Sequence, residues 1–98
     1  MTDADKINIF VHEGEGLTVE FKEHFTARID EDIVAFANTK GGTILLGVRD
    51  DRTIAGEKLT NDLKARINSI ARNCAPPIQT KIKHIQNIVA IEVPLNPV

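Results

Sequence analysis

The sequence predicts an α+β fold, a two-layer sandwich in which two helices cover a mixed sheet of four strands. Two observations support this prediction. Apolar residues recur with helical spacing in two segments, and in four others they alternate with polar residues or run continuously, as they do in strands. Read in chain order, these segments give β-α-β-α-β-β. The 98 residues suffice for one domain, residues 1–98, with a single core.

The N-terminal segment carries the weakest signal. Residues 1–14 are polar apart from a small apolar group at Ile7 to Val11, and we expect a weakly structured segment with a short helix or turn. Gly14 and Gly16 end it. A first strand follows, in which apolar residues facing a core alternate with polar residues facing away: Leu17, Val19 and Phe21 against Thr18, Glu20 and Lys22.

The segment from the first helix to the central strand organises the chain. A helix is expected over Ile29–Asn38, because its apolar residues have helical spacing and acidic residues stand near its positive end. The pair Gly41–Gly42 follows the helix. A residue just beyond a helix C-terminus usually adopts a positive φ, which glycine does without a steric penalty because it has no Cβ. The apolar run Thr43–Val48 predicts a strand covered on both faces. Arg49, Asp50 and Asp51 then lie at the mouth of the sheet.

A second helix and two strands complete the chain. The helix is expected between an N-cap at Thr60 or Asn61 and the pair Pro76–Pro77, which cannot continue it. Its apolar stripe consists of Leu63, Ile67, Ile70 and Cys74. Alternating strands are expected over residues 78–83 and 88–93, joined by a turn at Gln86–Asn87.

The composition restricts the setting in which this chain works. Cys74 is the single cysteine, so no disulfide forms within the chain and a cytoplasmic location is expected. No stretch approaches the roughly 20 apolar residues of a membrane-spanning helix, and the acidic N-terminus does not resemble a secretory signal. We therefore expect no membrane partner and no secretion.

The net charge of −2 hides an asymmetry between the two halves of the sequence. Residues 1–57 hold 12 acidic and 6 basic residues, whereas residues 58–98 hold 2 acidic and 6 basic. A basic half can face phosphates, although two solvated surfaces without a ligand explain the counts equally well. The candidate nucleic-acid-binding residues are Lys22, Lys64, Arg66, Arg72, Lys81 and Lys83. Because aromatic stacking residues are lacking, we expect sequence preference to be weak or absent.

Three motifs in this chain closely resemble those of the AlbA-2 or Schlafen-core family. They are EGLTVEFK at residues 15–22, AFANTKGG at 35–42, and LGVRDD at 46–51 with IAG at 54–56. The resemblance covers about residues 15–93 and implies an Alba-like fold with the same order of elements. It also implies nucleic-acid binding, of DNA or RNA, in some members as part of a transcriptional regulator. The family pattern normally continues past Val98, so we expect a truncated or minimal member, either a homodimer or part of a larger multidomain protein.

The resemblance to Schlafen proteins that cut RNA implies a three-carboxylate site at Glu15, Glu20 and Asp50. Such a site can hold Mg²⁺ or Mn²⁺ through oxygen ligands and activate a bound water, which gives an alternative function: a metal-dependent endoribonuclease acting on structured RNA such as tRNA. The structural alternative makes Glu20 a solvent-facing strand residue and Asp50 a turn former. A third hypothesis is an assembly domain that dimerises through an exposed strand edge.

Other site types are disfavoured by the sequence. There is no Gly-Lys-Ser/Thr motif for a nucleotide phosphate, and the region after Gly14 lacks the third glycine of a dinucleotide fingerprint. The histidines His12, His24 and His84 do not share metal-ligand spacing with each other or with Cys74. We therefore expect neither ATP binding nor a zinc site.

Overall fold

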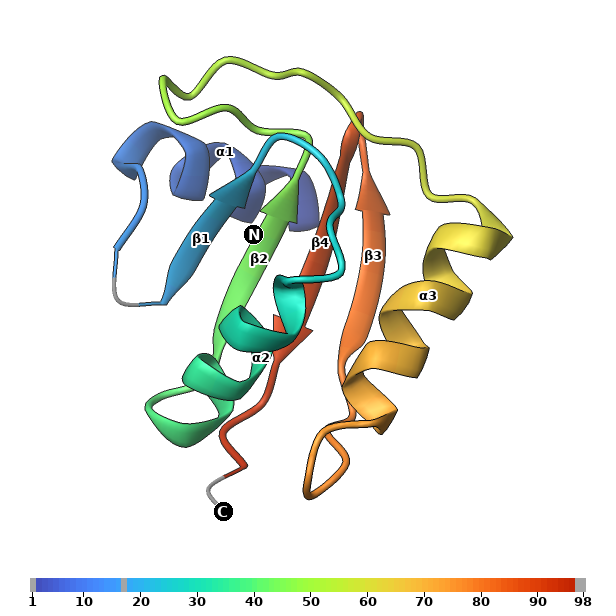
Figure 1. Ribbon diagram of the computed structural model, residues 1–98. Helices are drawn as coiled ribbons and strands as arrows, with labels where there is room; N and C mark the ends of the chain where they lie inside the picture. Colours follow the sequence, from blue (N-terminus) through green and yellow to red (C-terminus); the bar gives the residue numbers. More distant parts are fainter. Residues whose placement is uncertain (1, 17, 97–98) are drawn as a thin grey trace.

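The computed structural model describes residues 2–16 and 18–96 and contains one mixed sheet (Figure 1). Its strands lie in the order β1-β2-β4-β3, and β2 and β4 are central. β2 runs parallel to β1 and antiparallel to β4, which is also antiparallel to β3. The strands are β1 Val19–Lys22, β2 Gly42–Leu46, β3 Lys81–Ile85 and β4 Ile88–Val93. The predicted α+β fold class is confirmed.

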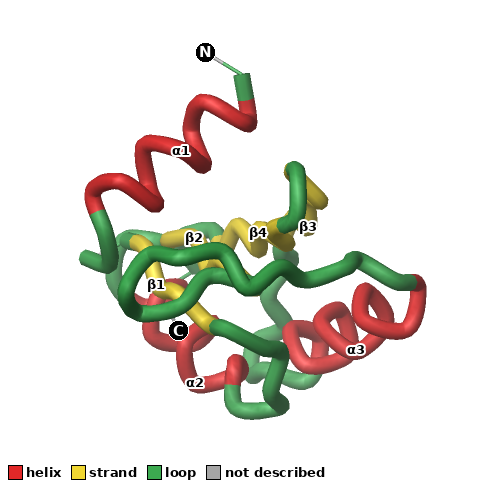
Figure 2. The backbone as a smooth tube through the Cα atoms, turned by 90° about the horizontal axis from the view of Figure 1, so that it is seen from above, coloured by secondary structure: helices red, strands yellow, loops and turns green. Residues whose placement is uncertain are grey.

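Helices cover both faces of this sheet. Figure 2 shows α1 on one face and α2 with α3 on the other. The helices are α1 Asp3–Glu13, α2 Ile29–Asn38 and α3 Asn61–Arg72. The bounds of α2 are those predicted. None of the helices in the described part of the chain has the length and apolar composition needed to span a bilayer.

Helix α1 is more regular than the weakly structured segment that the sequence predicted. Thr2 caps its N-terminus in a capping box with Asp5, in which each side chain accepts a hydrogen bond from the other residue's backbone N–H. The signal in the sequence was weak because Ile7 is its one fully buried residue, while Phe10 and Val11 are half-buried. The helix adds a layer to the two that were predicted.

The glycine pair after α2 is needed for two different reasons. Gly41 has φ of +73° and its N–H donates to the Phe36 carbonyl over 2.7 Å, so it is the residue that turns the chain out of the helix. Gly42 lies against the Phe36 ring, and a Cβ there would come within 2.5 Å of a ring carbon. The predicted role of the pair is confirmed, with positive φ at Gly41 alone.

Successive residues of β2 belong to two separate cores. Leu45 packs on the α1 face and Leu46 on the face covered by α2 and α3, and both are fully buried. The strand is therefore covered on both faces, as its continuous apolar sequence predicted. The α1-face core contains Ile7, Val19, Phe21, Leu45, Val48, Ile88 and Ala90; the larger opposite core includes Ile29, Ile33, Phe36, Ile44, Leu46, Ile67, Val89 and Ile91.

The polar residues of the edge strand β1 differ from the expectation that they face solvent. Val19 and Phe21 pack in the α1-face core, as predicted, whereas the predicted partner Leu17 lies outside the described residues. Glu20 and Lys22 do not face open solvent. They are half-buried on the opposite face, where the Lys22 ammonium lies 3.2 Å from the Asp32 carboxylate of α2.

Candidate nucleic-acid interface and carboxylate cluster

Helix α3 carries three of the six predicted nucleic-acid-binding residues. Lys64, Arg66 and Arg72 are all exposed, while Leu63, Ile67 and Ala71 on the same helix are buried. The Thr60 hydroxyl caps the helix by accepting a hydrogen bond from the Leu63 N–H over 3.1 Å. The apolar stripe thus fixes the helix to the sheet and leaves its cations in solvent.

The cations of α3 differ in their partners. Arg66 forms an ion pair of 2.9 Å with Asp62, one helical turn away, and both side chains are largely exposed. Within residues 2–16 and 18–96, no carboxylate lies within 4.0 Å of the cationic groups of Lys64 or Arg72. These two residues are eight positions apart, which places them about 12 Å apart along one side of the helix.

Lys81 and Lys83 lie on the other side of the sheet from α3. The Lys83 ammonium lies 3.4 Å from the Asp3 carboxylate of α1 and 3.4 Å from the Glu92 carboxylate of β4. Hydrogen bonds and charge attraction from Glu92 and then Asp3 raise the pKa of Lys83. Lys81 is exposed, points to the same face as Lys83 and stands opposite Glu92 in the strand register. The structure therefore divides the six predicted residues among separate surfaces.

Lys22 belongs to a carboxylate cluster beside α2. Its ammonium lies 3.9 Å from the Glu20 carboxylate and 3.2 Å from that of Asp32. Partial burial, followed by repulsion from Glu15 and Asp32, raises the pKa of Glu20, although Lys22 opposes the shift. A side-chain hydrogen bond between Glu15 and Glu20 acts in the same direction as the burial. Two of the three predicted metal-binding carboxylates thus meet.

Glu15 also has a structural partner. One of its carboxylate oxygens accepts a hydrogen bond of 3.3 Å from the backbone N–H of Phe21 in β1. Because β1 is an edge strand with β2 as its neighbour in the sheet, this contact covers part of its outer edge. Glu15 would have to keep or exchange this bond to act as a ligand.

Asp50, the third predicted carboxylate, is exposed in the turn after β2. Its neighbour Arg49 forms an ion pair of 3.2 Å with Glu23, which follows β1. Asp51 accepts hydrogen bonds from the hydroxyl and backbone N–H of Thr53, and these bonds lower the pKa of Asp51. Among the residues that the structure describes, no three His, Cys, Asp or Glu side chains form a group suited to a metal ion. The three-carboxylate site at Glu15, Glu20 and Asp50 therefore stays a prediction, of which the structure brings Glu15 and Glu20 together.

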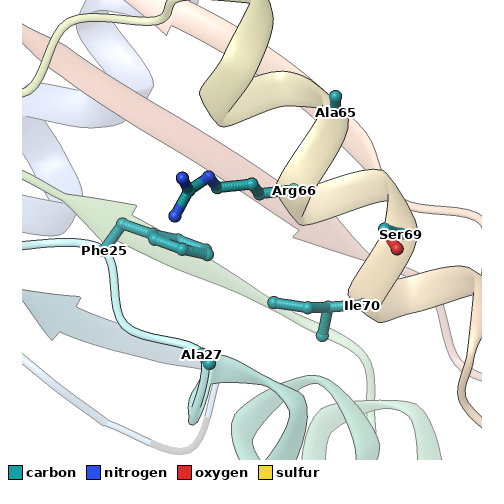
Figure 3. A pocket seen from close by; sticks show the side chains of 6 residues that line it. All are labelled: Phe25, Ala27, Ala65, Arg66, Ser69 and Ile70. Carbon is teal, nitrogen blue, oxygen red and sulfur yellow. The ribbon is translucent and has the colours of Figure 1, made fainter.

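A groove beside α3 contains a residue that the sequence analysis missed. Its volume is about 390 Å³, and it lies between α3 and the connection from β1 to α2. Figure 3 shows the Arg66 guanidinium extending towards the Phe25 ring, with Ile70 on the adjacent wall. We call this pocket the Phe25 groove; it is lined by Phe25, Ala27, Ala65, Arg66, Ser69 and Ile70. The sequence signal for this groove was Phe25, an aromatic residue in the otherwise polar connection between β1 and α2.

Comparisons with known proteins support the resemblance noted in the sequence. Residues 15–95 match a family model described as Schlafen, AlbA_2, and this match covers most of the chain. It includes the carboxylate cluster, the Phe25 groove and helix α3. A search among curated proteins gave no match.

Proposed function

This chain belongs to the Schlafen AlbA_2 family, and from that premise we propose that it is a nucleic-acid-binding domain that contacts phosphates through α3. The observation that carries the proposal is the exposure of Lys64, Arg66 and Arg72 on one helix. Lysine and arginine contacts to phosphates supply most of the sequence-independent affinity of such domains. The proposal leaves DNA and RNA as alternatives.

The charge distribution supports α3 over the other basic positions. Lys83 and Lys22 are each engaged by two carboxylates, so a phosphate would have to displace an existing partner. The first turn of α2 carries Asp30, Glu31 and Asp32, which repel phosphates from the region next to Lys22. A polyanion therefore approaches most favourably along α3.

The test compares two double variants with the same change of net charge. Arg66→Glu with Arg72→Glu reverses two charges on α3, and Lys6→Glu with Lys40→Glu reverses two exposed charges elsewhere. We expect the α3 variant to weaken binding of labelled duplex and single-stranded probes at least about tenfold, irrespective of sequence, and to reduce the salt slope by about two. Fluorescence anisotropy at several salt concentrations measures both quantities.

Two results would contradict this assignment. Equal losses in the two double variants would mean that net charge, not α3, determines affinity. Binding by the unmodified protein that ignored salt would exclude phosphate contacts as the main source of affinity. Melting curves of both variants show whether the fold is retained, and we expect little change because all four residues are exposed.

A second candidate, a metal-dependent endoribonuclease, is supported by the contact between Glu15 and Glu20. Its test is incubation of tRNA and DNA with the protein in Mn²⁺ or in EDTA. In a nuclease, Glu20→Gln and Asp50→Asn should each abolish Mn²⁺-dependent cleavage and leave binding in EDTA intact. In a binding domain, the same changes should leave affinity unchanged or raise it, because carboxylates repel phosphates.

Dimerisation through a strand edge stays a prediction. The outer edge of β1 is partly occupied, since Gly16 N–H donates to the Val19 carbonyl and Phe21 N–H donates to Glu15. β3 forms the other edge of the sheet. A β-bulge or proline introduced in β3 should abolish dimers in sedimentation experiments if this edge pairs two copies.

A further inference from the structure

The Phe25 groove adjoins a second pocket beside α2, and we call the two pockets together the channel. A second pocket of about 260 Å³ shares Ala27 and Ile70 with it and extends past Val34 to Cys74. Phe25 and Ile70 are half-buried and pack against the larger core, so the floor of the channel is held by the fold rather than by a free loop. The walls are apolar over most of this length.

Charged groups in the two parts of the channel have opposite sign. Arg66 lines the Phe25 groove, and Asp30 lines the second pocket. The partner of Arg66 is Asp62, and the two side chains are 63% and 76% exposed. Because an exposed ion pair contributes little free energy, a stronger anionic ligand can replace Asp62 as the partner of Arg66 at little cost. An arginine fork binds phosphate oxygens in pairs, which a surface carboxylate four residues away does not prevent.

From this combination we propose that the Phe25 groove binds one unpaired nucleotide, with its base against Phe25 and its phosphate at Arg66. The inference rests on the proposed nucleic-acid binding and names the form of nucleic acid recognised. A nucleotide joins a flat apolar ring to an anion, and the groove joins an aromatic floor to a cation. Asp30 favours this orientation of the nucleotide, because its carboxylate repels the phosphate from the second pocket.

The proposal makes single strands, loops and bulges the preferred ligands. A base in a duplex is stacked on both sides and cannot reach a ring in a groove, whereas an unpaired base can stack on any aromatic face. Such stacking tolerates different bases, so it agrees with weak sequence preference. In this proposal Phe25, beside the basic helix, is the stacking residue that the sequence was expected to lack.

The composition allows a direct spectroscopic test. The chain has no tryptophan and no tyrosine, so Phe25→Trp places a sole reporter in the groove. Titration with single-stranded oligothymidylate should quench its emission, and titration with a duplex of the same length should quench it far less. The matched control is Phe10→Trp, which puts the reporter on the α1 face, where neither ligand should quench it.

A second variant measures what the ring contributes to affinity. Phe25→Leu keeps an apolar side chain but removes the aromatic face, and we expect affinity for the single strand to fall about tenfold while affinity for the duplex stays unchanged. Melting curves establish that the variant is folded. Equal losses for both probes would overturn the inference, because stacking of an unpaired base affects the single strand alone.

Failure of this inference is distinguishable from failure of the proposed function. If Phe25→Leu changes neither affinity while Arg66→Glu with Arg72→Glu weakens both, the groove assignment is wrong and phosphate binding by α3 stands. If the unmodified protein binds no probe, both are wrong. Quenching of the Phe25→Trp variant by an added apolar peptide, with none by oligothymidylate, would make the groove a peptide site and overturn the nucleotide assignment.

Discussion

Lys83 and Arg52 on the α1 face of the sheet differ from Lys64 and Arg72 on the other face in what they contact. On the α1 face, Lys83 holds carboxylates of α1 and β4, and the Arg52 guanidinium donates a hydrogen bond of 2.6 Å to the His12 carbonyl in α1. On the other face, Lys64 and Arg72 extend into solvent. The difference shows that cations counted equally in a sequence can hold the fold together or remain available to a ligand.

The cores beneath these two surfaces also differ. The α1-face core is small and is covered by one helix, whereas the opposite core is larger and is covered by two. On the side of the larger core, the Phe25 groove lies between α3 and the connection from β1 to α2. The α1 face has a pocket of its own, of about 380 Å³, which lies between residues of α1 that include Val11 and residues beside the helix that include Arg52 and Ile88.

The largest expected effect is a loss of stability, which we compare between the two cores by truncating one leucine in each. Leu46→Ala should lower the free energy of unfolding by about 2–5 kcal/mol, because it opens a cavity in the larger core. Leu45→Ala should cost less within this range, because α1 can shift as one unit into the space. Urea unfolding monitored by circular dichroism measures both. A larger loss in Leu45→Ala would reverse the ranking of the two faces.

The next effect concerns the α2 face alone. Gly42→Val should destabilise the protein by about 1–3 kcal/mol, since its side chain would collide with the Phe36 ring. Gly16→Ala is the control, because a Cβ added there meets no atom within 4 Å. Thermal denaturation of the two variants measures the difference. An unchanged melting temperature in Gly42→Val would refute the close approach of α2 and β2.

A smaller effect is expected from the carboxylate cluster beside α2. The folded-state pKa of Glu20 lies above the ordinary value of 4.5, so ionised Glu20 weakens the fold at higher pH and protonation relieves this cost as pH falls through the raised pKa. Glu20→Gln should therefore raise the melting temperature at neutral pH, with the gain disappearing as pH falls towards 4.5. Melting curves across this pH range test the sign.

Asp51 provides the control of opposite sign. Its pKa is lowered by hydrogen bonds from Thr53, so its ionised form favours the folded state above the ordinary value of 3.8, and this contribution is lost as pH falls through the lowered pKa. Asp51→Asn should therefore lower the melting temperature at neutral pH. Equal shifts in the same direction for both variants would mean that overall charge, not local contacts, governs the response.

The smallest expected effect is a change in nucleic-acid affinity when Arg66 loses its carboxylate partner. Asp62→Asn removes the partner of Arg66, an exposed pair one turn apart on α3 that is worth about 0.3–0.5 kcal/mol. Affinity for a nucleic-acid probe should rise about twofold, and more at low salt. Anisotropy titrations can resolve this change. A loss of affinity would show that Asp62 positions Arg66 for binding instead of competing for it.

Most of the fold was predictable because local patterns determine it. Helix α2 was predicted from its acidic first turn, its apolar spacing and the glycine pair that follows it. Helix α3 was predicted from the threonine that caps its N-terminus and the two prolines that follow its C-terminus. The α1 helix was underestimated because one fully buried residue gives little periodicity. β3 was placed a few residues early, since Ile78 continues the strand pattern but packs into the core before Lys81 begins the strand.

The candidate site was less predictable because it depends on distant contacts. Lys83 and Asp3 are separated by 80 positions, and no local pattern indicates that they pair. Phe25 becomes part of a groove only because α3 packs beside its connection. The family motifs drew attention to Glu15 and Glu20, which do meet, but the packing of Asp32 near them was not visible in the sequence.

The central position of β4 has a consequence for how the chain acquires its structure during synthesis. Of the four strands in the described residues, β4 leaves the ribosome after the other three, yet it joins β2 to β3, so this sheet cannot close until residues 88–93 have emerged. Until then, Ile44 and Leu46 have no partner strand on one side, and their apolar surface is open to aggregation. Long-range pairing of this kind folds more slowly than local hairpins. The nascent chain should therefore depend on chaperones until β4 is made, which ribosome-bound chains of increasing length would reveal by protease resistance.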